Sequence, residues 1–150
     1  MDVLVYPKFH ADNREEALRK LVDFTFTKGY VKETYLDAVL EREKVFPTGL
    51  IIKGEYHVAI PHGDVEYVLK PVCAVGVLEK PVEFQFMGDP NQKVQVSVIF
   101  LLGVAKADAV VKTIAKMVEL FQKEGAVESI VNAECDEEIR KIVINELSID

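Results

Sequence analysis

Apolar residues follow a helical period in the first part of the chain. They recur three or four positions apart, which is the spacing of one face of an α-helix: Leu18, Leu21, Val22 and Phe26. Asn13 followed three residues later by Glu16 is a start signal of the capping-box kind, and Gly29 is a residue type that commonly ends a helix. The pattern therefore predicts a helix over residues 13–29.

A second helix is predicted over residues 34–46. Its apolar stripe consists of Tyr35, Ala38, Val39 and Phe46. Pro47 ends this helix, because the residue before a proline is pushed toward extended geometry.

The pattern then changes to that of extended strands. Apolar stretches of strand length follow one another at residues 49–52, 57–60, 72–78, 82–86 and 94–102. The last of these begins by alternating and then becomes continuously apolar, as expected of a central strand that is covered on both faces. Residues 88–91, with the sequence GDPN, indicate a loop or a hairpin turn.

Helical periodicity returns in the last third of the chain. Asp108 opens a segment that Gly125 ends, and its expected inward face is Val110, Val111, Ile114, Met117, Val118 and Phe121. A short helix is predicted over residues 126–131. Asp136 is the expected cap of a final helix whose apolar face is Ile139, Ile142, Val143 and Leu147.

Helices thus flank a block of strands on both sides in sequence. This order predicts an α/β (α+β) fold, in which a mixed β-sheet of about five strands is flanked by helices on both faces in three layers. The chain of 150 residues is long enough to bury a core of its own. We expect residues 1–150 to form a single domain.

Charge and cysteine content narrow the function classes. The net charge of −7 argues against a nucleic acid partner, because phosphate backbones are bound by basic surfaces. Cys73 and Cys135 form no CxxC pair, so neither a zinc site nor a redox pair is indicated. No signal peptide or apolar stretch long enough to span a bilayer is evident. We expect a soluble, cytoplasmic protein.

His62 stands in the most unusual context of the three histidines, within the sequence IPHGD. Pro61 restricts the backbone before the ring, and Gly63 leaves space after it. Such a site suits a neutral imidazole that accepts a phosphoryl group, with its second nitrogen held by a partner. Asp64 is a candidate for that partner, although a turn role fits it equally well. The alternative is an exposed turn histidine without a role.

Arg42 is the second candidate, because its position on the predicted helix places it on the apolar stripe. It follows Tyr35 by seven residues and precedes Phe46 by four. An inward arginine usually has an anionic partner, so its guanidinium is suited to hold a phosphoryl group. The alternative is that Arg42 reaches the surface and pairs with Glu43 or another carboxylate. For Glu41 and Glu43 themselves, a charged helix face is the favoured interpretation.

Two blocks of the sequence carry a family resemblance. The stretch EREKVFPTGL at residues 41–50 and VAIPHG at residues 58–63 resemble the enzyme IIA family of the bacterial phosphoenolpyruvate-dependent sugar phosphotransferase system. The similarity is to the fructose/mannitol type, and within it to the galactitol-specific components most. It extends over nearly the whole chain.

The resemblance implies a reaction and the residues that perform it. His62 would be the phosphoacceptor and Arg42 would stabilise the phosphoryl group. HPr would donate the group from a histidine, and a cysteine of a IIB component would receive it. A IIC membrane component would then use it on the imported sugar or sugar alcohol. No metal or organic cofactor is implied.

One departure from the family pattern leaves alternatives open. Many members of this type carry a second active-site histidine after the last strand, whereas this chain has no histidine beyond His62. This difference favours the galactitol-like branch. A regulatory IIA-like protein, whose phosphorylation state controls partner binding, remains a second hypothesis. A small-ligand binding domain without phosphate chemistry is a third.

Overall fold

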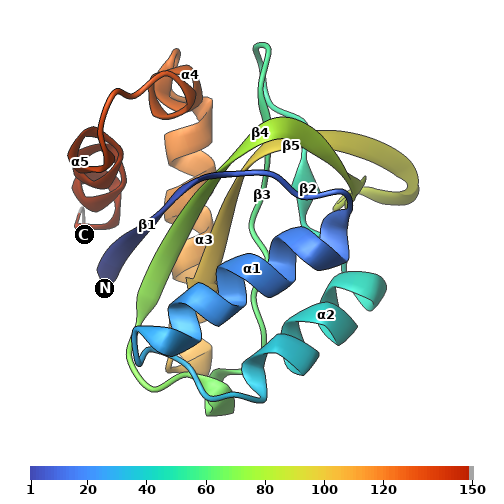
Figure 1. The fold of residues 1–150 in the computed structure, drawn as a ribbon, viewed down its shortest axis with the longest axis vertical. Coiled ribbons are helices and arrows are strands. Elements are labelled where there is room, and N and C mark those ends of the chain that lie inside the picture. The colour runs from blue at the N-terminus through green and yellow to red at the C-terminus, as the bar shows by residue number, and fades with distance from the viewer. Residues whose placement is uncertain (149–150) are drawn as a thin grey trace.

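A mixed five-stranded sheet forms the middle layer of the computed structural model, which describes residues 1–148 (Figure 1). Helices cover both of its faces, so the predicted three-layer architecture is confirmed. In chain order the elements are β1 (Asp2–Phe9), α1 (Arg14–Thr27), α2 (Tyr35–Val45), β2 (Gly49–Leu50), β3 (His57–Ala59), the 3₁₀ turn Val65–Tyr67, β4 (Val72–Phe86), β5 (Asp89–Gly103), α3 (Ala107–Gln122), α4 (Ala126–Val131) and α5 (Asp136–Leu147).

The long strands β4 and β5 form an antiparallel hairpin at the centre of the sheet. β1 runs parallel to β4, and β3 runs parallel to β5. The two-residue strand β2 pairs with β3 in the antiparallel sense and touches the end of β4. The segment that follows β3 therefore lies beside the final residues of β5.

Alternate residues of the central strands face two separate apolar cores. Ala74 and Ile99 belong to the core under α1 and α2. Cys73, Val75 and Phe100 belong to the core under α3, α4 and α5. Residues 72–78 of β4 and 96–103 of β5 are buried on both faces, which explains why these parts of the hairpin are almost continuously apolar instead of alternating.

Several strand boundaries differ from those predicted. β1 was not anticipated by the pattern. The predicted strands at 72–78 and 82–86 are one strand, β4, with an irregularity in register between Val77 and Val82. The hairpin turn occupies Met87 and Gly88, so most of the predicted 88–91 break already belongs to β5. The predicted 49–52 strand is only two residues long.

The helix signals at the start of α1 are confirmed. Asn13 is its N-cap, and its side chain accepts a hydrogen bond of 2.9 Å from the Glu16 backbone N–H. Gly29 follows the helix with a φ of +86°, a conformation that favours glycine. At α5 the prediction is shifted by one residue, because Cys135 is the N-cap and Asp136 begins the helix.

Three predicted inward side chains are exposed instead: Phe26, Phe46 and Val111. In α1 the buried stripe passes through Thr25, whose hydroxyl donates to the Leu21 carbonyl within its own helix. In α3 the stripe passes through Thr113. A threonine that satisfies its hydroxyl inside the helix can occupy a core position, and the apolar pattern alone does not show this.

Within residues 1–148, no helix combines the length and apolarity that a bilayer crossing requires.

Candidate active site

His62 lies just beyond β3, where the backbone is held on two sides. The Ile60 N–H donates to the Thr48 carbonyl at 3.3 Å, and the Leu102 N–H donates to the Pro61 carbonyl at 3.0 Å. His62 itself forms an isolated parallel bridge with Leu102 of β5. The imidazole therefore projects from a short segment that is fixed between β2 and the end of β5.

Both ring nitrogens of His62 have partners, and these partners determine the tautomer. Nδ1 lies 3.1 Å from the Ile60 carbonyl oxygen, and Nε2 lies 3.2 Å from the Arg42 Nε. The carbonyl can only accept and the guanidinium can only donate. Nδ1 therefore carries the proton, and Nε2 presents its lone pair toward Arg42.

The environment favours the neutral imidazole. Burial lowers the pKa of His62 below its ordinary 6.5, and the positive charge of Arg42 lowers it further, while the bond to Ile60 opposes the change. His62 as a whole residue is 8% exposed, so it is largely buried, as the lowered pKa requires. A neutral ring with an unprotonated Nε2 is the form that can attack phosphorus.

Arg42 is brought to His62 by α2, but it lies at the edge of the buried stripe of that helix, which is Tyr35, Val39 and Glu43, and not on the stripe as predicted. Its side chain is half-buried, and its Cζ lies 5.3 Å from the centre of the Phe46 ring. Phe46 is 60% exposed, so this ring covers the guanidinium from outside instead of packing in the core. Within the described part of the chain, the terminal NH₂ groups of Arg42 have no hydrogen-bond acceptor and remain free to bind an anion.

Glu43 does not belong to the charged helix face predicted for it. It is only 2% exposed, and its two carboxylate oxygens accept from the Thr48 hydroxyl and the Thr48 backbone N–H, each at 2.7 Å. Burial raises the pKa of Glu43 to about 7, against the opposing effects of Thr48, Arg14 and Arg42. Glu41, by contrast, is exposed as predicted.

Tyr35 connects α2 to the segment that carries His62. Its hydroxyl donates to the Leu102 carbonyl at 2.6 Å and accepts from the Gly63 N–H at 3.0 Å. The sequence predicted open space beside Gly63, but the structure shows that this space is filled. A Cβ at this position would lie 3.0 Å from the Tyr35 ring and 3.3 Å from Ala38. The glycine allows α2 to pack closely against the histidine loop.

Asp64, the other two histidines and Cys73 do not contribute to this site. Asp64 is exposed and its side chain makes no capping hydrogen bond, and the Ile60 carbonyl, not Asp64, holds the imidazole. His57 accepts a hydrogen bond from the Ile52 N–H, which is a structural role. His10 is exposed beside Asp12, and Cys73 is fully buried in the core.

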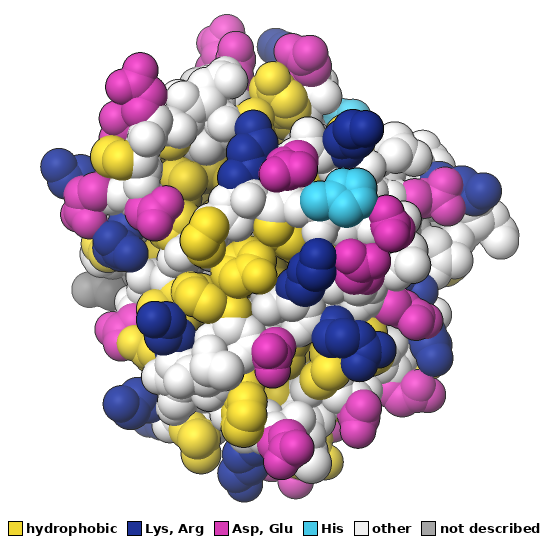
Figure 2. Space-filling model, viewed as in Figure 1, with side chains coloured by type: hydrophobic (Ala, Val, Ile, Leu, Met, Phe, Trp, Pro, Cys, Tyr) yellow, Lys and Arg dark blue, Asp and Glu magenta, His cyan; other side chains and the backbone are white. Residues whose placement is uncertain are grey.

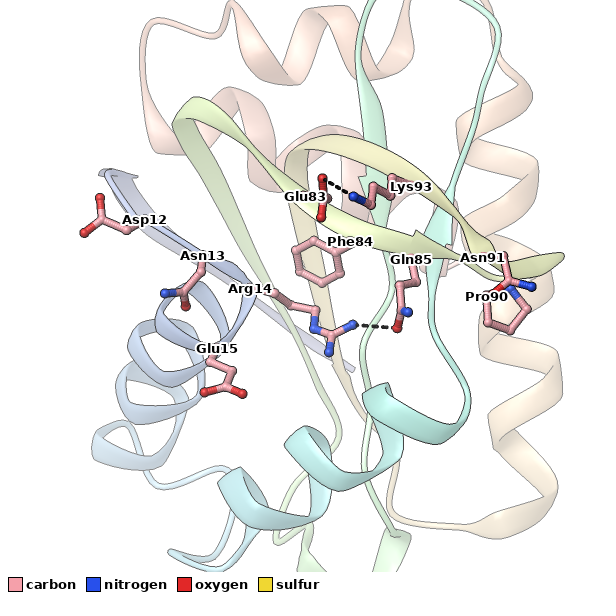
Figure 3. Close-up of a pocket in the computed structure, with 10 residues that line it drawn as sticks. All are labelled: Asp12, Asn13, Arg14, Glu15, Glu83, Phe84, Gln85, Pro90, Asn91 and Lys93. Carbon is pink, nitrogen blue, oxygen red and sulfur yellow. Dashed lines mark hydrogen bonds and ion pairs between the residues drawn. The ribbon is translucent and has the colours of Figure 1, made fainter.

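A shallow hollow of about 570 Å³ adjoins Arg42, between the outer face of α2 and the turn after His62, and Phe46, Asp64 and Tyr67 are among the residues that line it. A larger hollow of about 830 Å³ lies elsewhere, between the start of α1 and the β4–β5 hairpin (Figure 3). There the Arg14 side chain donates to Gln85 at 3.1 Å. Neither hollow is lined by His62, although Arg42, its partner, lines the smaller one.

Neither a basic surface in the view of Figure 2 nor a group of metal ligands among residues 1–148 accompanies this site. On the face shown in Figure 2, basic and acidic side chains are interspersed, and no continuous basic surface forms. Among residues 1–148, no group of three or more His, Cys, Asp or Glu side chains is arranged to hold a metal ion.

The sequence indicated His62 and Arg42, assigned Glu43 to a charged helix face, and missed the roles of Tyr35 and Thr48. Two spacings could have suggested them. Tyr35 lies two helical turns before Arg42, and Thr48 lies five residues after Glu43, just past the proline that ends α2.

Two curated relatives are similar to most of the chain. The mannitol-specific phosphotransferase enzyme IIA component of Halalkalibacterium halodurans is 32% identical over 136 residues, which is 88% of this chain and 85% of that protein. The galactitol-specific EIIA component of Escherichia coli is 28% identical over 119 residues, which is 79% of this chain and 78% of that protein. These identities give the galactitol branch no preference over the mannitol branch.

A solved structure supports the fold. The structure described as a complex of enzyme IIAMTL and phosphorylated enzyme IIBMTL from Escherichia coli matches with a TM-score of 0.74 and 23% identity, covering 94% of each chain. A family model described as "Phosphoenolpyruvate-dependent sugar phosphotransferase system, EIIA 2" matches residues 2–146. This match covers nearly the whole chain and confirms the resemblance of the two sequence blocks. The chain belongs to the EIIA 2 family of the phosphoenolpyruvate-dependent sugar phosphotransferase system.

Proposed function

We propose that this protein is a cytoplasmic phosphocarrier whose single domain, residues 1–150, receives a phosphoryl group on His62 and passes it on. The donor is the phosphohistidine of HPr, and the acceptor is a cysteine of a IIB component. The IIC membrane component then uses the phosphoryl group on the imported substrate. A sugar alcohol is the favoured substrate class, because the relatives above are specific for mannitol and galactitol.

The observation that carries this proposal is the direction of the His62 Nε2 lone pair. It points at a guanidinium that has free donors, in a site where burial keeps the ring neutral. In the first transfer, the Nε2 lone pair attacks phosphorus and the N–P bond of HPr breaks, with its electron pair returning to the HPr ring. In the second, the IIB thiolate attacks phosphorus and the electron pair of the N–P bond returns to Nε2.

Arg42 supplies the charge that these steps require. Negative charge is spread over the three outer oxygens of the phosphoryl group during transfer. A donor that is already in place stabilises this charge without reorganising water. The NH₂ groups of Arg42 are such donors, in a chain whose net charge is −7.

Labelling with phosphoenolpyruvate, enzyme I and HPr tests the proposal. We expect an acid-labile phosphoryl group on the wild-type protein that is lost when a IIB component is added. His62→Ala should abolish the label, whereas His10→Ala, which alters an exposed histidine, should keep it. Stable labelling that IIB does not discharge would indicate a regulatory protein, and equal labelling of His62→Ala would refute the assignment.

A further inference from the structure

The buried carboxyl of Glu43 is a second polar centre beside the proposed phosphoacceptor. Glu43 follows Arg42 directly in α2, but its side chain turns into the protein. Both of its oxygens are used by one residue, Thr48, which lies just after the Pro47 that ends the helix. The carboxyl therefore joins the end of α2 to the start of β2.

Hydrogen bonds continue from Thr48 to the ring of His62. The Thr48 carbonyl accepts from the Ile60 N–H at 3.3 Å, and the Ile60 carbonyl lies 3.1 Å from Nδ1 of His62. Thr48 is 2% exposed and Ile60 is fully buried, so water does not compete for these bonds. Ile60, whose carbonyl fixes the imidazole tautomer, is thus hydrogen-bonded to Thr48, and Thr48 is hydrogen-bonded to Glu43.

Glu43 also constrains the other partner of the site. Because it is adjacent to Arg42 in the last turn of α2, fixing its side chain limits any rotation or slide of the turn that presents the guanidinium. The same turn is closed by the Phe46 N–H, which donates to the Arg42 carbonyl at 2.7 Å. The Glu43 carboxyl thereby restrains both Arg42, through the last turn of α2, and His62, through Thr48 and Ile60.

We propose that Glu43 is a positioning residue of the phosphotransfer site, acting through Thr48 and Ile60 to hold Nε2 of His62 in line with Arg42. The inference rests on the function proposed above. A carboxyl is a costly group to bury, and an apolar side chain would fill the same space without that cost. Its bidentate contact to Thr48 supplies a directional constraint that an apolar contact lacks.

Two substitutions separate positioning from filling of the core. Glu43→Gln keeps the shape, and its amide can accept from the Thr48 N–H while donating to the Thr48 hydroxyl oxygen. Glu43→Leu fills the space without either bond. Glu119→Leu makes the same chemical change at an exposed position of α3 and serves as the matched control.

The first measurement is the nitrogen NMR spectrum of the His62 ring in the unphosphorylated protein, with its pH titration. We expect wild type, Glu43→Gln and Glu119→Leu to show one tautomer with the proton on Nδ1. Glu43→Leu should show a mixture of tautomers and a shifted titration midpoint. The second measurement is the rate of transfer from HPr, which should fall roughly tenfold or more in Glu43→Leu and be restored by Glu43→Gln.

A folded Glu43→Leu with an unchanged His62 tautomer and an unchanged transfer rate would overturn the proposal. If Glu43→Leu does not fold, Thr48→Val, which removes only the hydroxyl donor to Glu43, provides the same two readouts. The two proposals fail separately. If Glu43→Leu shows mixed tautomers but His62 of the wild-type protein is not labelled, the proposed function is refuted and the positioning role is kept. If wild-type His62 is labelled but Glu43→Leu keeps its tautomer and its transfer rate, the positioning role is refuted and the function is kept.

Discussion

The Nε–H of Arg42 points at Nε2 of His62 across 3.2 Å, and the donor therefore faces the atom that has to act as nucleophile. This contact confines the imidazole proton to Nδ1 before a phosphoryl group arrives. The guanidinium must then exchange the ring nitrogen for phosphoryl oxygens as the N–P bond forms. One arginine thus prepares the nucleophile and afterwards stabilises the charge that its attack creates.

Removing the guanidinium should slow transfer without preventing folding. Arg42→Ala is expected to raise the barrier for transfer from HPr by about 2 to 4 kcal/mol, because the donors to the phosphoryl oxygens are lost. Arg42→Lys should recover part of the rate, since it restores the charge but not the planar fork. Rapid-quench measurement of single-turnover transfer provides the comparison, and a rate within about twofold of wild type would remove Arg42 from the mechanism.

The transfer rate should depend on pH through His62. The ring must be neutral to attack, and burial and Arg42 lower its pKa below 6.5. The rate is therefore expected to stay level from pH 8 down past the ordinary histidine range, and to fall only at more acidic pH. Single-turnover rates with pre-phosphorylated HPr from pH 5 to 8 test this, with HPr's own titration measured separately. A rate that already falls with a midpoint at or above pH 6.5 would contradict the prediction.

Glu43 should make the protein less stable as pH rises. Its folded-state pKa is raised from 4.5 to about 7, so the folded protein binds the proton more tightly than the unfolded chain does. The corresponding stability is fully present below pH 4.5 and is lost as pH rises toward 7, by about 3 kcal/mol in total. Glu43→Gln lacks this titration. The wild-type minus Glu43→Gln difference in unfolding free energy, from denaturant titrations at pH 4.5 to 8, should fall along that course, and a constant difference would refute it.

The hydroxyl of Tyr35 should contribute to stability through its two backbone partners. Tyr35→Phe leaves the Gly63 N–H and the Leu102 carbonyl without this partner inside the protein. We expect a loss of about 1 to 3 kcal/mol in unfolding free energy. Tyr56→Phe is the control, because within residues 1–148 the tyrosine hydroxyls that form hydrogen bonds are those of Tyr30 and Tyr35. Equal denaturation midpoints for the two variants would show that the Tyr35 contacts contribute nothing.

The sequence predicted those features that local periodicity determines. Helical spacing distinguished Arg42 from the fully solvated residues of α2, although it lies at the edge of the buried stripe, and the apolar run 94–102 identified the central strand β5. β1 escaped notice because its pairing with β4 joins residues about seventy positions apart, and Pro7 interrupts its alternation. Such long-range pairing leaves little trace in a local window.

The polar contacts of the site could not be predicted for a different reason. A glutamate next to Arg42 in a helix is by default solvated, and the burial of Glu43 depends on the turn at Pro47 that brings Thr48 back to its carboxylate. The partner of Nδ1 is a backbone carbonyl, that of Ile60, which no side-chain pattern reports. Gly63 was correctly singled out, but its purpose is close packing against Tyr35.

Identifying the labelled atom is the most direct test of the account. The protein should be phosphorylated with phosphoenolpyruvate, enzyme I and HPr, and the product examined at alkaline pH by phosphorus and nitrogen NMR. We predict a single N–P bond at Nε2 of His62, with Nδ1 still protonated toward Ile60. A phosphoryl group on Nδ1, or on any other residue, would contradict the central claim.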